Sequence, residues 1–167
     1  KVYLESGPRT YLRNLHIEPD IERDAVTLSV EAAGESVADS AILFEIRDEE
    51  ASLLMSERRD ASTGRVSARL IFPAAPKRWT LDTPALYHAR VTLINNSEAL
   101  DVQTHRFGMR RFDMSNGRFY LNGEPIFIKG VLLQPDYPLT IVLPDVETAR
   151  RELTMMKEAG VNMVRAH

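Results

Sequence analysis

Hydrophobic and polar residues alternate with a period of two through most of the first 107 residues. The clearest stretches place apolar side chains at every second position and are Val26–Ala32, Ile42–Ile46, Val66–Phe72 and Tyr87–Leu93. This alternation is typical of β-strands with one buried face, because successive side chains point to opposite sides of a strand. With Tyr11–Ile17 and Ala99–His105 added, the pattern predicts about six or seven strands.

Turn-forming residues separate these predicted strands. They cluster at Glu18–Asp20, Ala33–Glu35, Asp60–Gly64 and Asn95–Ser97. Short strands joined by such turns, over about a hundred residues, are typical of an immunoglobulin-like antiparallel β-sandwich. The sequence contains no cysteine, so this mainly β interpretation rests on the number and spacing of the strands.

After residue 117 the pattern changes. Asn122-Gly123 stands between the apolar runs Phe119–Leu121 and Ile126–Ile128. Asn-Gly accepts the positive φ angles that a two-residue turn requires, so these residues predict a β-hairpin.

A helical pattern follows the hairpin. Asp145 can cap a helix whose apolar residues recur at intervals of three and four, namely Val146, Ala149, Leu153 and Met156. Gly160 ends the predicted helix, and Val161–Arg165 is apolar enough for a buried strand. With Ile126–Val131 ahead of the helix, the pattern predicts one βαβ unit with parallel strands. Two parallel strands leave open edges, which further strands would cover in a complete protein.

Several motifs in this region resemble one enzyme family. The runs FYLNGEPI at 119–126, KGV at 129–131 and MKEAGVNMVR at 156–165 resemble the start of the catalytic barrel in glycoside hydrolase family 2, which includes β-galactosidases, β-glucuronidases and β-mannosidases. Upstream, WT at 79–80 with TPALY at 83–87 resembles the sandwich that precedes this barrel, and FGMR at 107–110 resembles its exit. The resemblance covers almost the whole chain.

The resemblance implies three parts: a sandwich at 1–107, a linker at 108–117, and a truncated N-terminal portion of a (β/α)8 TIM-barrel catalytic domain at 118–167. Because the chain opens on Lys1 without a methionine, we expect a fragment of a longer protein. The implied parent enzyme hydrolyses O-glycosyl bonds of terminal β-linked sugars through a covalent intermediate, and this chain supplies scaffold and barrel rim.

Retaining hydrolysis requires two carboxylates about 5 Å apart. In the family both are glutamates on later barrel strands, so we expect no catalytic residue here and no activity from this chain alone. Asp145 is explained as a helix cap, and the glutamates of the predicted helix have no assigned role in catalysis.

Four polar residues follow or end the two predicted barrel strands, where active sites of such barrels lie: Gln134, Asp136, Arg165 and His167. Arg165 matches the Arg of the family's Asn-x-x-Arg motif, and this resemblance implies that it supports the nucleophilic carboxylate by charge pairing. A structural salt bridge is the alternative. His167 resembles the nearby family His, although the spacing is shortened to Arg-Ala-His.

The rim also departs from the family pattern. Many members have Gly-x-Asn-Arg-His-Glu after the first barrel strand, whereas this chain has GVLLQP at 130–135. Gln134 and Asp136 remain candidates for substrate binding, with an ordinary turn at 135–138 as the alternative. The departure weakens a specific expectation of galactosidase activity.

Composition limits the possible partners. A net charge of −3 gives no electrostatic reason to expect nucleic acid, and no apolar run reaches the roughly 18 residues of a membrane span. We expect no cofactor and no metal site, because His16, His88 and His105 have no second ligand at a suitable spacing. The expected partners are a carbohydrate substrate in the intact protein, the rest of the barrel and a possible second copy in a homo-oligomer.

Two alternatives stay open from the sequence. A stand-alone immunoglobulin-like module that binds carbohydrate or protein would explain residues up to Phe107, and Trp79 could then stack on a sugar, although burial at one end of the sandwich explains Trp79 more simply. An intact small α+β enzyme would need an acid/base constellation that the sequence does not contain. The compartment is open, with a periplasmic or secreted protein favoured over a cytoplasmic one.

Overall fold

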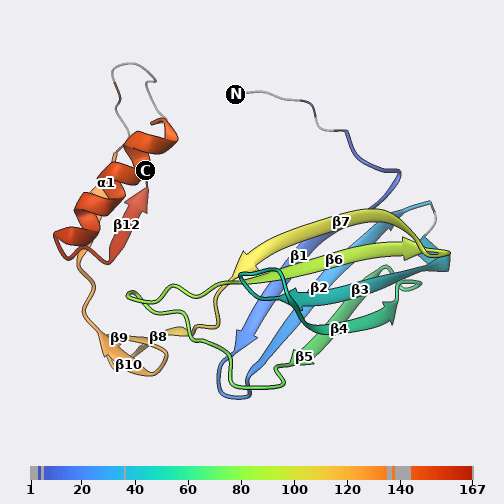
Figure 1. Cartoon of the computed structure of the whole chain (residues 1–167), viewed down its shortest axis with the longest axis horizontal. Coiled ribbons are helices and arrows are strands. Elements are labelled where there is room, and N and C mark those ends of the chain that lie inside the picture. The colour runs from blue at the N-terminus through green and yellow to red at the C-terminus, as the bar shows by residue number, and fades with distance from the viewer. Residues whose placement is uncertain (1–3, 5, 36, 135–136, 138–143, 167) are drawn as a thin grey trace. The chain divides into compact units, whose positions relative to one another are not determined.

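The computed structural model describes residues 4, 6–35, 37–134, 137 and 144–166. The chain divides into two compact units, Lys1–Arg111 and Phe112–His167 (Figure 1).

The first unit is a sandwich of two antiparallel sheets. Its strands are β1 (Thr10–Asp20), β2 (Ala25–Gly34), β3 (Ser40–Arg47), β4 (Leu53–Asp60), β5 (Arg65–Ile71), β6 (Tyr87–Asn95) and β7 (Glu98–Phe107), with a short 3-10 helix η1 (Val37–Asp39). One sheet has the order β1-β2-β5 and the other the order β4-β3-β6-β7. The predicted immunoglobulin-like sandwich is confirmed, and β4 is a strand that the periodicity did not identify.

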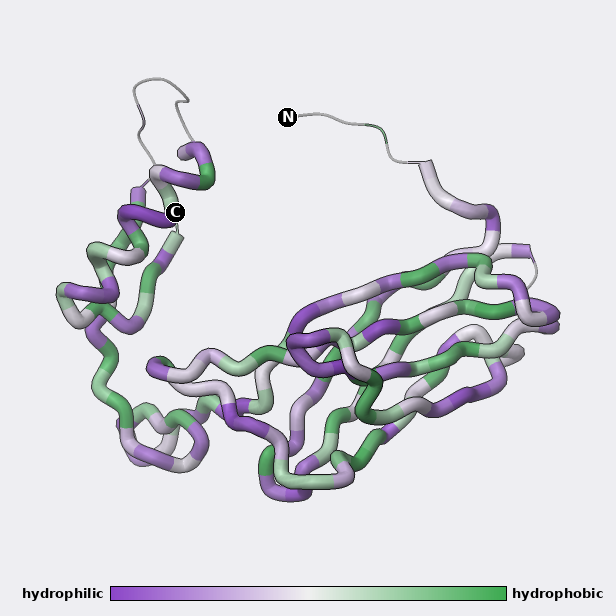
Figure 2. Tube along the Cα trace, in the orientation of Figure 1, coloured by the Kyte–Doolittle hydropathy of each residue, from purple (hydrophilic) through white to green (hydrophobic). Residues whose placement is uncertain are grey.

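The core lies between the inner faces of the two sheets. Its fully buried side chains come from alternate positions and include Leu28 of β2, Phe44 and Ile46 of β3, and Leu93 of β6. Each such side chain contributes about 1.5–3 kcal/mol to folding through its removal from water. Figure 2 shows apolar and polar residues following one another along these strands, as the sequence pattern predicts.

One predicted turn is wrong. Residues Glu18–Asp20 belong to β1, in which Pro19 pairs with Val26 of β2. Proline is tolerated here because β1 is the edge strand of its sheet and needs no partner on its outer side. The chain turns after Asp20 instead, whose carboxylate accepts hydrogen bonds from the backbone N–H groups of Glu22 and Arg23. The predicted turns at Asp60–Gly64 and Asn95–Ser97 are confirmed.

Side chains join the two sheets where β1 and β7 meet. The Asp101 carboxylate accepts a hydrogen bond of 2.7 Å from the backbone N–H of Leu12, and the Gln103 amide donates one of 2.7 Å to the Leu12 carbonyl. Next to this contact β1 contains a bulge, with Asn14 at φ 55°. A bulged edge with satisfied backbone groups is a poor template for pairing with another chain.

Trp79 packs against the segment that follows β7, residues 108–110. Its backbone N–H donates to the Met109 carbonyl at 3.1 Å, and the Cζ atom of Arg110 lies 4.3 Å from the centroid of the indole ring. Gly108 lies so close that a methyl group added to it would come within 2.7 Å of Trp79 Cβ. Met109 is fully buried in the sandwich core. The indole is partly buried and Arg110 covers one of its faces, which favours a structural role over stacking on a sugar.

The second unit contains two small sheets and one helix. Strands β8 (Phe112–Ser115), β9 (Arg118–Leu121) and β10 (Glu124–Ile126) form an antiparallel sheet, while β11 (Gly130–Leu133) pairs in parallel with β12 (Met163–Ala166). Helix α1 (Val146–Glu158) connects β11 to β12. The predicted hairpin and βαβ unit are confirmed.

The details of this unit add to the sequence prediction. Asn122 and Gly123 have positive φ angles of 54° and 87°, as the hairpin turn requires, and Asn116-Gly117 repeats this geometry between β8 and β9. The strand predicted at Ile126–Val131 is wrong in its bounds, because Ile126 belongs to β10 and β11 begins at Gly130. The stretch 108–117, expected as a linker, contains both β8 and the buried Met109. The division into domains stays a prediction.

Within the described residues, no helix is both long and apolar enough to span a bilayer.

Replacing Gly108 with alanine tests the packing of Trp79. Because the new methyl group would collide with the Trp79 side chain, we expect Gly108→Ala to lower the free energy of unfolding by about 1–3 kcal/mol. Trp79 is the only tryptophan, so its fluorescence in a urea titration reports both stability and displacement of the ring. Gly7→Ala is the matched control, since nothing lies within 4 Å of a methyl group there. Equal midpoints for the two variants would contradict the packing argument.

An ion cluster at the β1–β2 turn makes stability depend on pH. Asp20 pairs with Arg69 at 2.7 Å and with Arg23 at 3.2 Å. The hydrogen bond from Arg69, followed by those from Arg23, lowers the pKa of Asp20 from 3.8 to about 2. A carboxylate whose pKa is lower in the folded state stabilises the fold above its unfolded pKa, and this contribution is lost as the pH falls toward the folded value.

Replacing Asp20 with asparagine should therefore remove part of the acid sensitivity. We expect Asp20→Asn to be less stable than the unaltered chain at pH 6, and the difference to shrink between about pH 4 and pH 2. Urea titrations at several pH values measure it, with the exposed Asp82→Asn as the control. A difference that stayed constant down to pH 2 would show that Asp20 acts through packing and not through its charge.

Candidate functional site

The candidate site is the carboxyl edge of the parallel pair β11 and β12. The register pairs Gly130 with Met163, Val131 with Val164, Leu132 with Arg165 and Leu133 with Ala166. Because the strands are parallel, their carboxyl ends meet at the same edge. In α/β barrels this is the edge at which active sites lie.

Asn162 fixes the start of this pairing. Its Oδ1 accepts a hydrogen bond of 2.8 Å from the Lys129 backbone N–H, and its Nδ2 donates one of 2.9 Å to the Phe127 carbonyl. The Asn162 backbone N–H also donates to the Lys129 carbonyl at 3.0 Å. The Asn162 side chain thus bonds to a backbone N–H and to a backbone carbonyl in the segment ahead of β11. We expect these bonds to set the register of the strand pair that carries Arg165.

Helix α1 begins and ends at the residues that the sequence indicated. The Asp145 carboxylate caps the amino end by accepting from the Thr148 backbone N–H at 2.8 Å, and this bond lowers the pKa of Asp145. At the carboxyl end Gly160 has φ 82° and donates to the Lys157 carbonyl, while Val161 donates to the Met156 carbonyl. These two bonds form a Schellman motif, which turns the chain back toward β12.

The two faces of the β11–β12 pair differ in exposure. Val131, Leu133 and Val164 are partly buried, whereas Leu132 and Arg165 are exposed. Alternate residues of a strand point to opposite faces, so Val131, Leu133 and Val164 share the less exposed face of the pair. Arg165 lies on the other face.

Two of the four predicted rim residues can be placed. Arg165 stands opposite Leu132, one residue from the end of β12, and Gln134 follows β11 directly and is exposed. In the part of the chain that the structure describes, Arg165 forms no ion pair. Asp136 and His167 lie outside the described residues.

Tyr137 contacts helix α1, which the sequence did not indicate. Its hydroxyl donates a hydrogen bond of 2.6 Å to Glu152 of α1, and this carboxylate raises the pKa of Tyr137. The bond ties the segment after β11 to the helix. No local pattern signals it, because the two residues are 15 positions apart and belong to different elements.

Arg165 is the charged side chain that the structure places at this edge. The guanidinium of Arg165 can form two parallel hydrogen bonds with a carboxylate, and it cannot act as an acid or base near neutral pH. Two acids of this unit have structural partners: Asp145 caps helix α1, and Glu152 accepts from Tyr137. Among the described residues, no three His, Asp or Glu side chains are grouped closely enough to hold a metal ion.

The fold and this edge define a class: an immunoglobulin-like sandwich followed in the same chain by a hairpin and a parallel βαβ unit with an arginine at its carboxyl edge. The family model of the glycosyl hydrolases family 2 matches residues 10–110. The chain belongs to this family.

Curated relatives extend the match beyond the sandwich. A β-galactosidase of Pseudoalteromonas haloplanktis is 28% identical over 177 aligned positions, which cover 98% of this chain and 17% of the relative. A β-galactosidase of Pectobacterium atrosepticum is 34% identical over 110 positions, or 65% of this chain and 10% of the relative. The chain thus spans less than a fifth of the length of these enzymes.

Solved structures share the fold. A β-glucuronidase of Bifidobacterium dentium superposes with a TM-score of 0.80 at 21% identity, over 95% of this chain and 27% of that enzyme. A β-glucuronidase of Ruminococcus gnavus gives a TM-score of 0.77 at 16% identity, over 95% and 26%. At these identities the likeness concerns the fold alone.

Replacing Asn162 tests whether it sets the strand register. Because Asn162→Ala leaves two backbone groups without their partner, we expect the local opening free energy around β11 to fall by about 1–3 kcal/mol. Amide hydrogen exchange of Lys129 and Val131 measures the change. Asn162→Asp keeps the acceptor but loses the donor, so it should have an intermediate effect. Unchanged exchange in both variants would show that the register is set elsewhere.

Proposed function

We propose that this chain is the sandwich and barrel start of a retaining β-glycoside hydrolase that acts on terminal β-linked sugars. In this proposal residues 1–107 form the sandwich domain, 108–117 connect it, and 118–167 are the N-terminal portion of a TIM-barrel catalytic domain. The chain supplies scaffold and part of the barrel rim.

The observation that carries the proposal is the parallel register of β11 and β12. It brings Gln134 and Arg165 to one edge, on a strand pair whose open sides require further strands. The hairpin, the parallel crossover and membership in the family support a barrel start at this position. A barrel of this type needs about 250 residues, far more than follow β10 in this chain.

Catalysis is assigned to the parent enzyme and not to this chain. Retaining hydrolysis needs a nucleophilic carboxylate and an acid/base carboxylate about 5 Å apart across the bond that breaks. We assign neither role to the acids of the βαβ unit, since Asp145 caps α1 and Glu152 accepts from Tyr137. We infer that this chain by itself does not hydrolyse glycosides.

Arg165 is proposed to support the nucleophilic carboxylate. A guanidinium beside that carboxylate keeps it ionised, which the attack on the sugar requires. Gln134, Asp136 and His167 are proposed as further rim residues that contact substrate or the nucleophile. The substrate class is a carbohydrate with a terminal β-linked sugar, in agreement with the names of the relatives. The other proposed partners are the rest of the barrel and, in an oligomer, a second copy.

A panel of aryl β-glycosides tests the proposal. The 167-residue chain and a longer chain that continues through the remaining length of the relatives are assayed side by side at one concentration. We expect turnover by the longer chain alone, and the preferred aryl glycoside identifies the sugar. Turnover by the shorter chain would mean that its own carboxylates are catalytic. Inactivity of both would favour a carbohydrate- or protein-binding module.

Replacing Arg165 in the longer chain tests its assigned role. We expect Arg165→Gln to lower kcat by about 10²–10³ with a smaller effect on KM, because the lost charge acts on the transition state. The acidic limb of the kcat/KM profile should also move to higher pH, since the nucleophile loses the cation that keeps its pKa low. Arg151→Gln on helix α1 is the control. A loss of activity with an unmoved acidic limb would assign Arg165 a structural role.

A further inference from the structure

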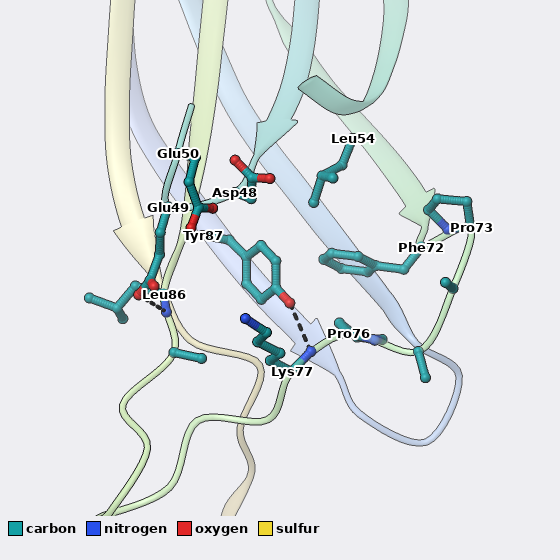
Figure 3. Close-up of a pocket in the computed structure, with 13 residues that line it drawn as sticks. Asp48, Glu49, Glu50, Leu54, Phe72, Pro73, Pro76, Lys77, Leu86 and Tyr87 are labelled. Atoms are coloured by element: carbon teal, nitrogen blue, oxygen red, sulfur yellow. Dashed lines mark hydrogen bonds between the residues drawn. The ribbon is translucent and has the colours of Figure 1, made fainter. Parts of the chain in front are cut away.

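A pocket opens at the end of the sandwich where β6 begins. Its volume is about 260 Å³, and it lies between the β3–β4 turn, the segment after β5 and the first residues of β6. Figure 3 shows Tyr87 in the middle, with Phe72 and Leu54 on one side and the acidic residues Asp48 to Glu50 on the other. Pockets for drug-sized ligands measure about 300–1,000 Å³, so this one has room for a single small ring or a short chain.

The interior of the pocket is apolar and held in place. The rings of Phe72 and Tyr87 contact edge to face, with their centroids 5.1 Å apart, and each residue is only 7% exposed. The Tyr87 hydroxyl accepts a hydrogen bond of 2.8 Å from the Lys77 backbone N–H, which fixes the segment after β5 against the ring. These two rings form a preformed apolar wall of the pocket.

The mouth of the pocket is negatively charged. Three consecutive acids line it, and two are anchored: Asp48 accepts from the Ser52 backbone N–H at 2.8 Å, and Glu49 accepts from the Leu86 backbone N–H at 3.1 Å. Glu50 is exposed and forms no ion pair with any residue that the structure describes. Lys77 is the one basic residue of the lining and likewise pairs with none of the described acids. Three carboxylates against one ammonium leave the pocket with a net negative charge.

We propose that this pocket binds a small organic cation: an ammonium group on an aromatic body, with the body against Phe72 and Tyr87 and the charge among Asp48 to Glu50. The apolar wall stabilises the body by removing it from water, and the carboxylates attract the charge. The same charges oppose a carboxylate or phosphate ligand. The site belongs to the sandwich, so it goes beyond the proposed glycosidase function and does not depend on it.

Titration of the 15N-labelled 167-residue chain with benzylammonium tests this proposal by NMR. We expect saturable shifts confined to amides around the pocket, above all Glu49, Lys77 and Leu86. Benzyl alcohol and benzoate carry a similar body with no charge or the opposite charge, and both should bind more weakly than benzylammonium. Binding of benzoate or benzyl alcohol as strong as that of benzylammonium would overturn the assignment of a cation site, and so would the absence of shifts at the pocket.

Titration with n-butylammonium distinguishes a free aromatic amine from a lysine of a partner protein, because n-butylammonium has the same chain and charge as a lysine side chain. Weaker binding than benzylammonium supports a free aromatic amine, whereas tighter binding would overturn that choice in favour of a lysine on a partner protein.

A pair of variants isolates the role of the charge. Glu50→Gln should weaken benzylammonium binding about two- to fivefold, the effect of one exposed ion pair, and the loss should shrink as salt is added. Glu98→Gln makes the same charge change at the β6–β7 turn, at the opposite end of β6 from Tyr87, and should leave the affinity unchanged. If both variants lost the same affinity for benzylammonium, the effect would come from the net charge of the protein and not from the pocket, and the site would be overturned. Benzylammonium binding that is unaffected by Glu50→Gln would also overturn it.

Discussion

The sandwich depends on one constraint: each of its two sheets must bury every second side chain against the other sheet. Phe44 and Leu28 satisfy it at the centre, where both are fully buried. The remaining parts of the unit serve this contact. Asp101 satisfies the backbone of Leu12 where the sheets meet at their edges, and Met109 continues the same core past the last strand. A sandwich of this size tolerates varied loops as long as this internal alternation is kept.

Features that arise locally were predictable from the sequence. Alternation identified six of the sandwich strands, and Asn122-Gly123 identified the hairpin, because both signals act between near neighbours. Strand β4 has no such signal, since its sequence LLMSERRD lacks alternation and its position comes from pairing with β3. The start of β11 was missed for a related reason. The backbone just ahead of that strand is bonded to Asn162, more than thirty positions away, which no local pattern reveals.

The candidate site also has features that the sequence predicts and features that depend on contacts between distant residues. A parallel crossover brings the ends of its two strands to one edge, so the placement of Arg165 and Gln134 follows from recognising the βαβ unit. Contacts between distant side chains could not be foreseen. The Tyr137–Glu152 bond joins residues whose types alone carry no mutual signal. The pocket around Tyr87 combines the β3–β4 turn with the two ends of the β5–β6 connection, which are separate in the sequence.

The order of the two units along the chain has a consequence for biosynthesis. A ribosome releases the sandwich before the βαβ unit, because every strand of its two sheets lies before residue 108, so the sandwich can fold while the βαβ unit is still being made. The βαβ unit emerges later with Phe127 at 80% and Leu132 at 57% exposure. Those surfaces attract chaperones and other nascent chains until they are covered. Early folding of the sandwich thus shortens the time during which apolar surface of the nascent polypeptide is exposed.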